Sequence, residues 1–373
     1  MNPTSSEESG ASAGRQIEYT EESKISMSRH SIFIKSFVLI AVLTNVGVTY
    51  GWDALPKTAP NSPSNPSSLA KVELGKKLYF DPRISKSGAI SCNSCHNVMA
   101  GGDDNRPHSV GVGGKLGGRS APTVWNSAFY SVQFWDGRAN TLEDQAIGPM
   151  TNPVEMAMAS HDMVIDRLRR IPAYVAEFKT VFPASAEMTI SDAAKAIAAY
   201  ERTLITPNSR FDRFIKGSKG ALNAQEQRGM KKMETVGCLA CHSGANFSGP
   251  KLPVGQGFFM KFPLIAGSAF EKKYDLTKDL GRFEVSKDEK DKNLWRVPTL
   301  RNVALTAPYF HNGSVKTLDE AVRVMAKTQL GKDLQSDEVG DIVAFLKSLS
   351  GEFPKQVMPR LPETDGFTLI DED

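Results

Sequence analysis

One pentapeptide occurs twice in this chain and constrains its fold more than any other feature. The pattern C-x-x-C-H is found at residues 92–96 (CNSCH) and at residues 238–242 (CLACH). The two copies use all four cysteines of the 373 residues, so no thiol is left for a separate structural disulfide. The fold must therefore provide two sites, and at each site two thiols and the neighbouring imidazole must be able to face the same ligand.

This pattern is typical of covalent haem attachment, in which both thiols add to the haem vinyl groups and the adjacent histidine binds the iron. We therefore expect two covalently bound c-type haems. The expected thioether residues are Cys92, Cys95, Cys238 and Cys241, and the expected proximal ligands are His96 and His242. One alternative is a thioredoxin-like redox pair, for which a βαβ context is not evident. The other is zinc, which usually requires a second pair of ligands in the same small module.

Composition narrows the class of protein. The chain has 45 Lys plus Arg and 42 Asp plus Glu, a net charge of +3, which argues against a nucleic-acid partner and against an acidic tail protein. Hydrophobic residues make up 40% of the chain, enough to bury real cores. The length alone suggests about two or three domains.

The N-terminal residues have the features of an export signal. Basic residues precede an apolar stretch at residues 37–48, which is shorter than the roughly 20 apolar residues that a membrane-spanning helix requires. We expect residues 1–50 to be a polar extension and signal peptide, and residues 51–68 a linker. Because bacteria attach haem c outside the cytoplasm, the expected location is the periplasm. An uncleaved N-terminal anchor is the alternative, since no clean A-x-A cleavage site follows.

An internal repeat divides the chain. Residues 122–144 align with residues 298–320 without gaps, and eight of the 23 positions are identical. Together with the two pentapeptides, this predicts two related haem modules at residues 69–210 and 211–350, followed by a C-terminal tail at residues 351–373.

Helical patterns predominate in both modules. Thr141-x-x-Asp144 and Thr317-x-x-Glu320 resemble capping boxes, and a stripe of apolar residues follows Ser336. Strand-like alternation is scarce. The expected fold class is mainly α, with two cytochrome c-like haem domains in tandem and little strand.

The repeat also predicts a difference between the modules. At the same offset, Met325 of the second module aligns with Pro149 of the first. A methionine thioether can be the second axial ligand of a haem and raises its reduction potential, whereas proline has no donor atom. We therefore expect a closed second haem and an open first haem. The alternatives are that Met325 packs in a core, or that Met260 is the ligand.

From Leu74 to Ser350, the chain resembles the bacterial dihaem cytochrome c peroxidase family. The resemblance is carried by residues 74–82 (LGKKLYFDP), 92–96 with 101–102, 134–138 (FWDGR), 148–149 with 154–156, and 300–311 (LRNVALTAPYFH). It implies reduction of hydrogen peroxide to water with electrons from a small cytochrome c or a cupredoxin. Members are often homodimers.

The resemblance also assigns roles to individual residues. Glu155 matches the distal acid/base and Gln145 its hydrogen-bonding neighbour, in the segment that flanks Pro149. Trp135 matches the tryptophan between the haems. The haem at His96 would be the low-potential peroxidatic one, and the haem bound by His242 and Met325 the high-potential one.

Two positions depart from the family pattern. The switch histidine of many members aligns with Val112 here, and His108 is the nearby candidate for that role. An interdomain calcium would take carbonyl oxygens from Thr306 and Pro308, but its asparagine ligand aligns with Ser120. A calcium site with this set of ligands would keep several water molecules.

Three functions remain open from the sequence. The first is a periplasmic cytochrome-c peroxidase. The second is a dihaem electron carrier or redox sensor without peroxidase activity. The third is the related enzyme that matures methylamine dehydrogenase, which ranks lowest because that relative has a tyrosine ligand where this chain has Met325.

Overall fold

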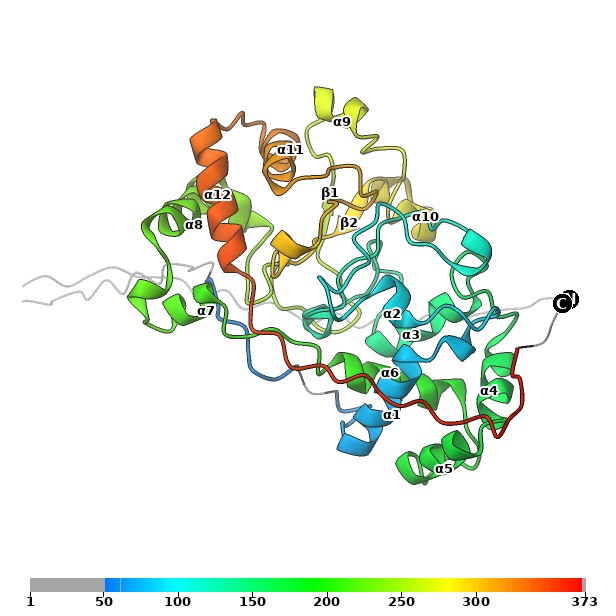
Figure 1. The fold of residues 1–373 in the computed structure, drawn as a ribbon. Coiled ribbons are helices and arrows are strands. Elements are labelled where there is room, and N and C mark those ends of the chain that lie inside the picture. Colours follow the sequence, from blue (N-terminus) through cyan, green and yellow to red (C-terminus); the bar gives the residue numbers. More distant parts are fainter. Residues whose placement is uncertain (1–50, 61, 371–373) are drawn as a thin grey trace, which may run out of the picture. The chain divides into compact units, whose positions relative to one another are not determined.

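Helices dominate the computed structural model, which describes residues 51–60 and 62–370 (Figure 1). The expected signal peptide at residues 1–50 lies outside the described residues. In the first module the α-helices are α1 (Leu69–Phe80), α2 (Cys92–Cys95), α3 (Leu142–Thr151), α4 (His161–Arg169), α5 (Pro172–Val181) and α6 (Ile190–Glu201). Those that follow are α7 (Arg210–Ile215), α8 (Ala224–Val236), α9 (Ala269–Lys273), α10 (Phe283–Ser286), α11 (Leu318–Leu330) and α12 (Ser336–Ser348).

The strands of the described residues form a single small sheet. Strand β1 (Phe259–Lys261) pairs antiparallel with β2 (Leu294–Arg296), and Met260 lies opposite Trp295. The prediction of a mainly α fold with little strand is confirmed.

The two copies of the repeat have the same local structure. The Thr141 hydroxyl accepts a hydrogen bond from the Asp144 N–H at 3.0 Å at the start of α3, and Thr317 caps α11 in the same way. Before each helix, an asparagine has left-handed backbone geometry, with φ of 65° at Asn126 and 60° at Asn302. The equivalence therefore extends from sequence to backbone conformation.

The two copies meet at one buried side chain. The Thr206 hydroxyl accepts hydrogen bonds from the side-chain amides of Asn126 and Asn302, at 2.8 and 2.9 Å. All three residues are completely buried. The repeats are thus joined through equivalent asparagines at a common point.

Each module has its own hydrophobic core, although the described residues form one compact unit. Helix α1 packs against α6 in the first core, and α8 packs against α12 in the second. Both helix pairs approach closely at a glycine. A Cβ at Gly75 would lie 1.8 Å from the Ala196 carbonyl oxygen, and one at Gly229 would lie 1.9 Å from that of Asp341. The module boundary at residue 210 remains a prediction.

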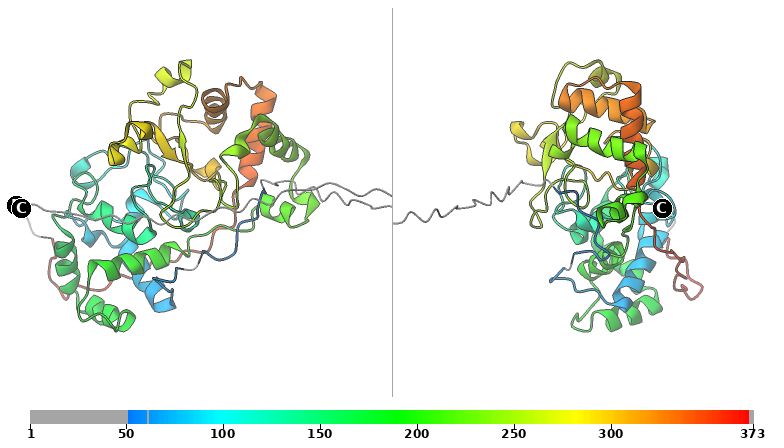
Figure 2. Two further views of the ribbon diagram at one scale, coloured as in Figure 1. Left: turned by 180° about the vertical axis from the view of Figure 1, so that it is seen from behind. Right: turned by 90° about the vertical axis from the view of Figure 1, so that its left-hand side faces the viewer.

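The predicted C-terminal tail is a strap over the first module. Figures 1 and 2 show that the chain after α12 returns alongside the helices of the first half. The Arg83 guanidinium donates to the Pro362 carbonyl at 2.8 Å, and Tyr200 donates to the Gln356 side chain at 3.0 Å. Leu369 is buried in the first core. The described part of the tail, residues 351–370, therefore helps to complete the core of the first module.

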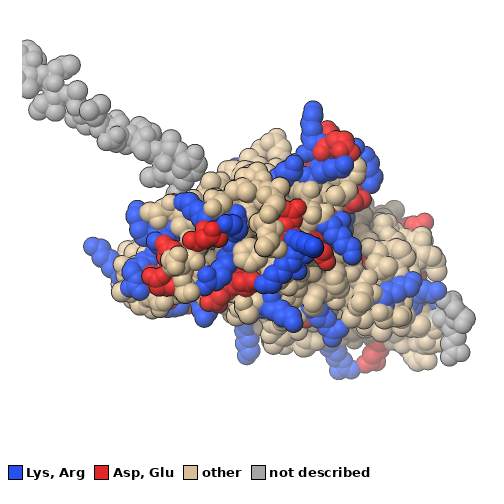
Figure 3. All heavy atoms as spheres, turned by 90° about the horizontal axis from the view of Figure 1, so that it is seen from above, with Lys and Arg blue, Asp and Glu red and all other residues tan. Residues whose placement is uncertain are grey.

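The surface carries both signs of charge. Figure 3 shows lysine and arginine interspersed with aspartate and glutamate on one face. Within the described residues, no helix combines the length and apolar character needed to cross a membrane.

Candidate active site

The first C-x-x-C-H motif opens into a cavity of about 520 Å³. This volume lies within the range typical of cofactor pockets. The cavity brings together nearly all the residues predicted for the first site. Its lining includes Cys92, Cys95, His96, Ser120, Trp135, Gln145, Pro149 and Glu155.

The proximal side of this cavity is built by one short helical turn. Ser91 and Ser94 form a reciprocal capping box at the start of α2, which fixes the turn that carries both thiols. His96 follows directly, and its Nδ1 lies 2.9 Å from the Pro122 carbonyl oxygen. A carbonyl can only accept, so Nδ1 carries the proton and the Nε2 lone pair is available to a metal.

The second motif has the same arrangement. Its cavity of about 230 Å³ is lined by Cys238, Cys241 and His242. The Nδ1 of His242 donates to the Phe247 carbonyl at 3.0 Å, and burial lowers the pKa of both this histidine and His96. Both imidazoles are therefore neutral, which is the form that binds iron.

The alternative roles of the motifs gain no support from the structure. All four cysteines are free, and burial raises the pKa of Cys95 and of Cys238 to about 11. A reactive redox pair requires a lowered thiol pKa instead. Among the described residues, no cluster of three or more histidine, cysteine or acidic side chains could hold a metal ion such as zinc.

A buried arginine with one unpartnered N–H group supports the fit of a porphyrin. Arg296 lines both cavities and is buried, and its Nη1 has no hydrogen-bond partner within the described part of the chain. Its Nε donates to the Phe134 carbonyl at 2.9 Å, so the guanidinium is held in place. A buried guanidinium with an unpartnered N–H group and no carboxylate partner is costly, and a haem propionate is a carboxylate that would satisfy it.

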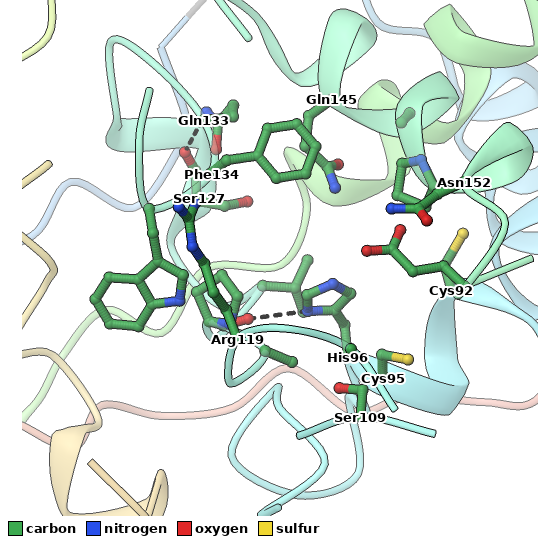
Figure 4. A pocket seen from close by; sticks show the side chains of 18 of the residues that line it. Cys92, Cys95, His96, Ser109, Arg119, Ser127, Gln133, Phe134, Gln145 and Asn152 are labelled. Atoms are coloured by element: carbon green, nitrogen blue, oxygen red, sulfur yellow. Dashed lines mark hydrogen bonds between the residues drawn. The ribbon is translucent and has the colours of Figure 1, made fainter. Parts of the chain in front are cut away.

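The distal side of the first cavity is polar. Figure 4 shows the Gln145 amide and the His96 imidazole pointing toward the same space. Burial raises the pKa of Glu155, although the nearby Arg138 opposes this shift. Pro149 lines the same wall from α3 and offers no donor atom.

In the second cavity, the residue equivalent to Pro149 is a methionine. Met325 lines that cavity from α11, at the position equivalent to Pro149, and Met260 lines it from β1. The expected ligand and its predicted rival are therefore both at the second site. Pro149 thus lines the cavity of the first motif and Met325 that of the second, and the ligand role of Met325 remains a prediction.

The wall between the cavities contains Trp135, which lines both of them. Its indole N–H donates to the Ser120 carbonyl at 2.9 Å, and its own carbonyl accepts from the Arg296 N–H at 2.9 Å. These two bonds fix the ring between the sites.

The structure does not bring His108 to the first site. Ser109 and Gly111 line the cavity, but His108 is not part of the lining. The Val112 N–H, where the switch histidine aligns, donates to the Glu155 carbonyl at 2.9 Å. A Cβ at Gly111 would lie 2.1 Å from the Val154 carbonyl oxygen, so this loop packs directly on the Glu155 segment. A ligand role for His108 would require this loop to move.

The residues predicted for calcium are spread over the wall of the second cavity. Thr306, Pro308 and Ser120 all line it, but the Ser120 hydroxyl donates to the Arg106 carbonyl at 3.3 Å. The neighbouring carbonyls of Leu305 and Ala307 accept hydrogen bonds from the Asn105 side chain, both at 3.1 Å. Calcium binding remains a prediction.

Sequence reasoning missed two groups at these sites. Arg296 gave no signal, because one arginine in a short strand has no distinctive pattern. Glu201 ends the alanine-rich helix α6 and lines the first cavity together with Ile197, one turn earlier. The apolar face of α6 that includes Ile197 continues to a glutamate, and this continuation was the available signal.

Comparisons with known proteins agree with this architecture. The family model of di-haem cytochrome c peroxidase matches residues 69–220. The cytochrome c551 peroxidase of Pseudomonas aeruginosa is 47% identical over 319 residues, covering 84% of this chain and 88% of that protein. The cytochrome c551 peroxidase of Nitrosomonas europaea is 41% identical over 344 residues, covering 91% of this chain and 96% of that protein. A crystal structure of a MauG-like protein associated with microbial copper homeostasis superimposes with a TM-score of 0.69 at 29% identity, covering 81% of this chain and 96% of that one.

Proposed function

This chain belongs to the di-haem cytochrome c peroxidase family, and we propose that it reduces hydrogen peroxide to water with electrons from a small redox protein. The asymmetry of the two cavities carries the proposal. Two equivalent proximal motifs face different distal sides, with Pro149, Gln145 and Glu155 at the first and Met325 at the second. This arrangement suits a reaction site that is supplied by an electron-transfer site.

The first cavity is the proposed reaction site. A haem held by Cys92, Cys95 and His96 would supply an iron at which peroxide is bound and reduced. Pro149 lines the same cavity and has no side-chain donor that could bind this iron. Glu155 takes the proton from the nearer peroxide oxygen and returns it to the farther one, which leaves as water. Gln145 donates a hydrogen bond that orients the substrate.

Burial suits Glu155 for this task. A carboxyl group moves protons efficiently when its pKa lies closer to neutral pH than that of an exposed glutamate. The raised pKa of Glu155 is in this direction. The overall balance is one peroxide, two electrons and two protons, giving two water molecules.

The second cavity is the proposed entry point for electrons. His242 and Met325 would bind its haem, and methionine ligation favours a high reduction potential. Trp135 lies in the wall that the two cavities share, so it is the proposed path between them.

The remaining features follow from the motifs and from the family. We propose covalent thioether attachment of both haems and a periplasmic location. The proposed electron donor is a small cytochrome c or a cupredoxin, and a homodimer and one bound calcium ion are further expectations.

Replacement of Glu155 tests the proposal. We expect Glu155→Gln to lower peroxide turnover about 10²- to 10⁴-fold, the usual contribution of a general acid/base, while both haem spectra stay intact. Glu187→Gln is the matched control, because Glu187 is exposed and outside the cavity lining. Turnover of Glu155→Gln close to that of the wild type would exclude the role proposed for Glu155.

A further inference from the structure

The first cavity is also lined by Glu201, an acid that the proposed reaction does not use. Glu201 is the last residue of α6, is 5% exposed and lines the cavity. One of its carboxyl oxygens, Oε2, has no hydrogen-bond partner among the described residues. A buried polar oxygen left without a partner is costly, so its presence at a cofactor cavity requires an explanation.

Within the described residues, Glu201 has no ion pair of its own. The charge of Arg202 lowers the pKa of Glu201, but its guanidinium forms two hydrogen bonds with the Glu143 carboxylate, at 2.8 and 3.0 Å. Glu143 in turn adds a negative charge that opposes ionisation of Glu201.

The other groups near Glu201 are also engaged. The Tyr79 hydroxyl donates to the His96 carbonyl at 2.6 Å, and the Tyr200 hydroxyl donates to Gln356. The remaining electrostatic neighbour is the sulfur of Cys92, which is a haem attachment point in the proposed function. Burial raises the pKa of Glu201 to about 8, so both its forms are accessible near neutral pH.

This placement suits Glu201 to a protonation change that follows the oxidation state of a haem in the first cavity. When an electron arrives at a centre inside a poorly solvated cavity, the added negative charge disfavours a nearby carboxylate. The same event therefore favours proton uptake by a buried acid without a counter-ion. Glu201 combines burial, a place in the cavity wall and an unpartnered oxygen, which are the requirements for such a response.

We propose that Glu201 takes up one proton from solvent when the haem of the first cavity accepts an electron, and releases it when that haem is oxidised. The proposal rests on the proposed binding of a haem by residues 92–96. In the forward step, the redox-protein donor supplies one electron, solvent supplies one proton, and the Glu201 carboxylate becomes a carboxylic acid. No covalent bond forms other than this O–H bond, and oxidation reverses both transfers.

The pH dependence follows from linkage. Reduction raises the proton affinity of Glu201, so its pKa is higher in the reduced protein than in the oxidised protein. Between these two pKa values, the reduction potential of the first haem falls as pH rises, approaching one proton per electron. Above and below this window, which lies around pH 8, Glu201 contributes no slope.

Potentiometric titration of the holoenzyme between about pH 6 and about pH 10 tests the proposal, because this range spans the expected window. We expect the wild type to show the slope at the first haem and Glu201→Gln to lose it, with both haems still attached and the spectra unchanged. Glu155→Gln removes the acid of the proposed proton transfer and should keep the slope. A slope that persists in Glu201→Gln, or that is lost only in Glu155→Gln, would overturn the role of Glu201.

A second measurement needs no variant. Once the second haem is reduced, addition of one further electron to the first haem in weakly buffered wild-type protein near pH 8 should take up a proton from solution. Absence of proton uptake would also overturn the inference. Neither readout depends on peroxide turnover, so failure here is distinct from failure of the proposed peroxidase activity.

Discussion

At the scale of single residues, the proximal sides of the two sites are alike and the distal sides differ. His96 and His242 each donate Nδ1–H to a backbone carbonyl, of Pro122 and Phe247 respectively. A backbone acceptor orients the ring firmly, because it is fixed by the fold itself. In the proposed function, the residue on the distal side, Pro149 or Met325, therefore distinguishes the two sites.

Replacement of Met325 separates it from its rival at the second site. We expect Met325→Leu to convert the second haem to a high-spin form and to lower its reduction potential, because the thioether ligand is lost. Visible and EPR spectra with a redox titration measure both effects. Met260→Leu is the matched control, since Met260 lines the same cavity. If Met260→Leu produced these changes and Met325→Leu did not, the ligand assignment would be reversed.

At the scale of elements, close helix pairs support each haem motif. Gly75 of α1 lies against the backbone of α6, and Gly229 of α8 against that of α12. Helices α1 and α8 each precede a C-x-x-C-H motif, so these contacts set the position of the cavity walls. The glycines are required for space rather than for an unusual backbone angle.

A methyl group at Gly75 should separate the first of these helix pairs. Its Cβ would lie 1.8 Å from the Ala196 carbonyl oxygen, which is backbone and cannot turn away. We expect Gly75→Ala to lower the free energy of unfolding by about 1–3 kcal/mol or more, as overpacking does. Denaturant unfolding measures this change. Gly220→Ala is the control, because nothing lies within 4 Å of a Cβ there; equal stability of the two variants would contradict the account.

At the scale of the whole molecule, the two modules are connected by several contacts between residues far apart in the sequence. Thr206 joins equivalent asparagines of the two repeats, and Trp135 lies in the wall common to both cavities. The segment after α12 then returns to the first module, where Leu369 is 3% exposed. The two sites are therefore held within one compact unit, although each module has its own core.

The C-terminal strap should contribute to the stability of the first module. Leu369→Ala removes a side chain buried in the first core, for which the usual cost is about 2–5 kcal/mol. Thermal unfolding followed at the first haem should report this loss. Phe367→Ala provides the comparison, because Phe367 is 70% exposed and should change stability little. Equal stability of the Leu369→Ala and Phe367→Ala variants would show that the strap is not part of the folded core.

Local signals in the sequence predicted much of this structure. The caps at Thr141 and Thr317 and the repeat placed α3 and α11, and with them Pro149 and Met325. The C-terminal strap was missed because it is held by contacts across more than 150 positions of the chain, such as that of Tyr200 with Gln356. Glu201 was missed because an apolar stripe predicts a buried face without showing whether that face meets a core or a cavity.

In the proposed function, the first haem is open and the second is closed. The most direct test is a visible and EPR spectrum of the half-reduced protein, in which only the high-potential haem carries an electron, before and after addition of cyanide. We expect a high-spin signal or cyanide binding at the first haem and an unchanged low-spin second haem. Two six-coordinate haems that bind no cyanide would contradict it and would favour an electron carrier or redox sensor.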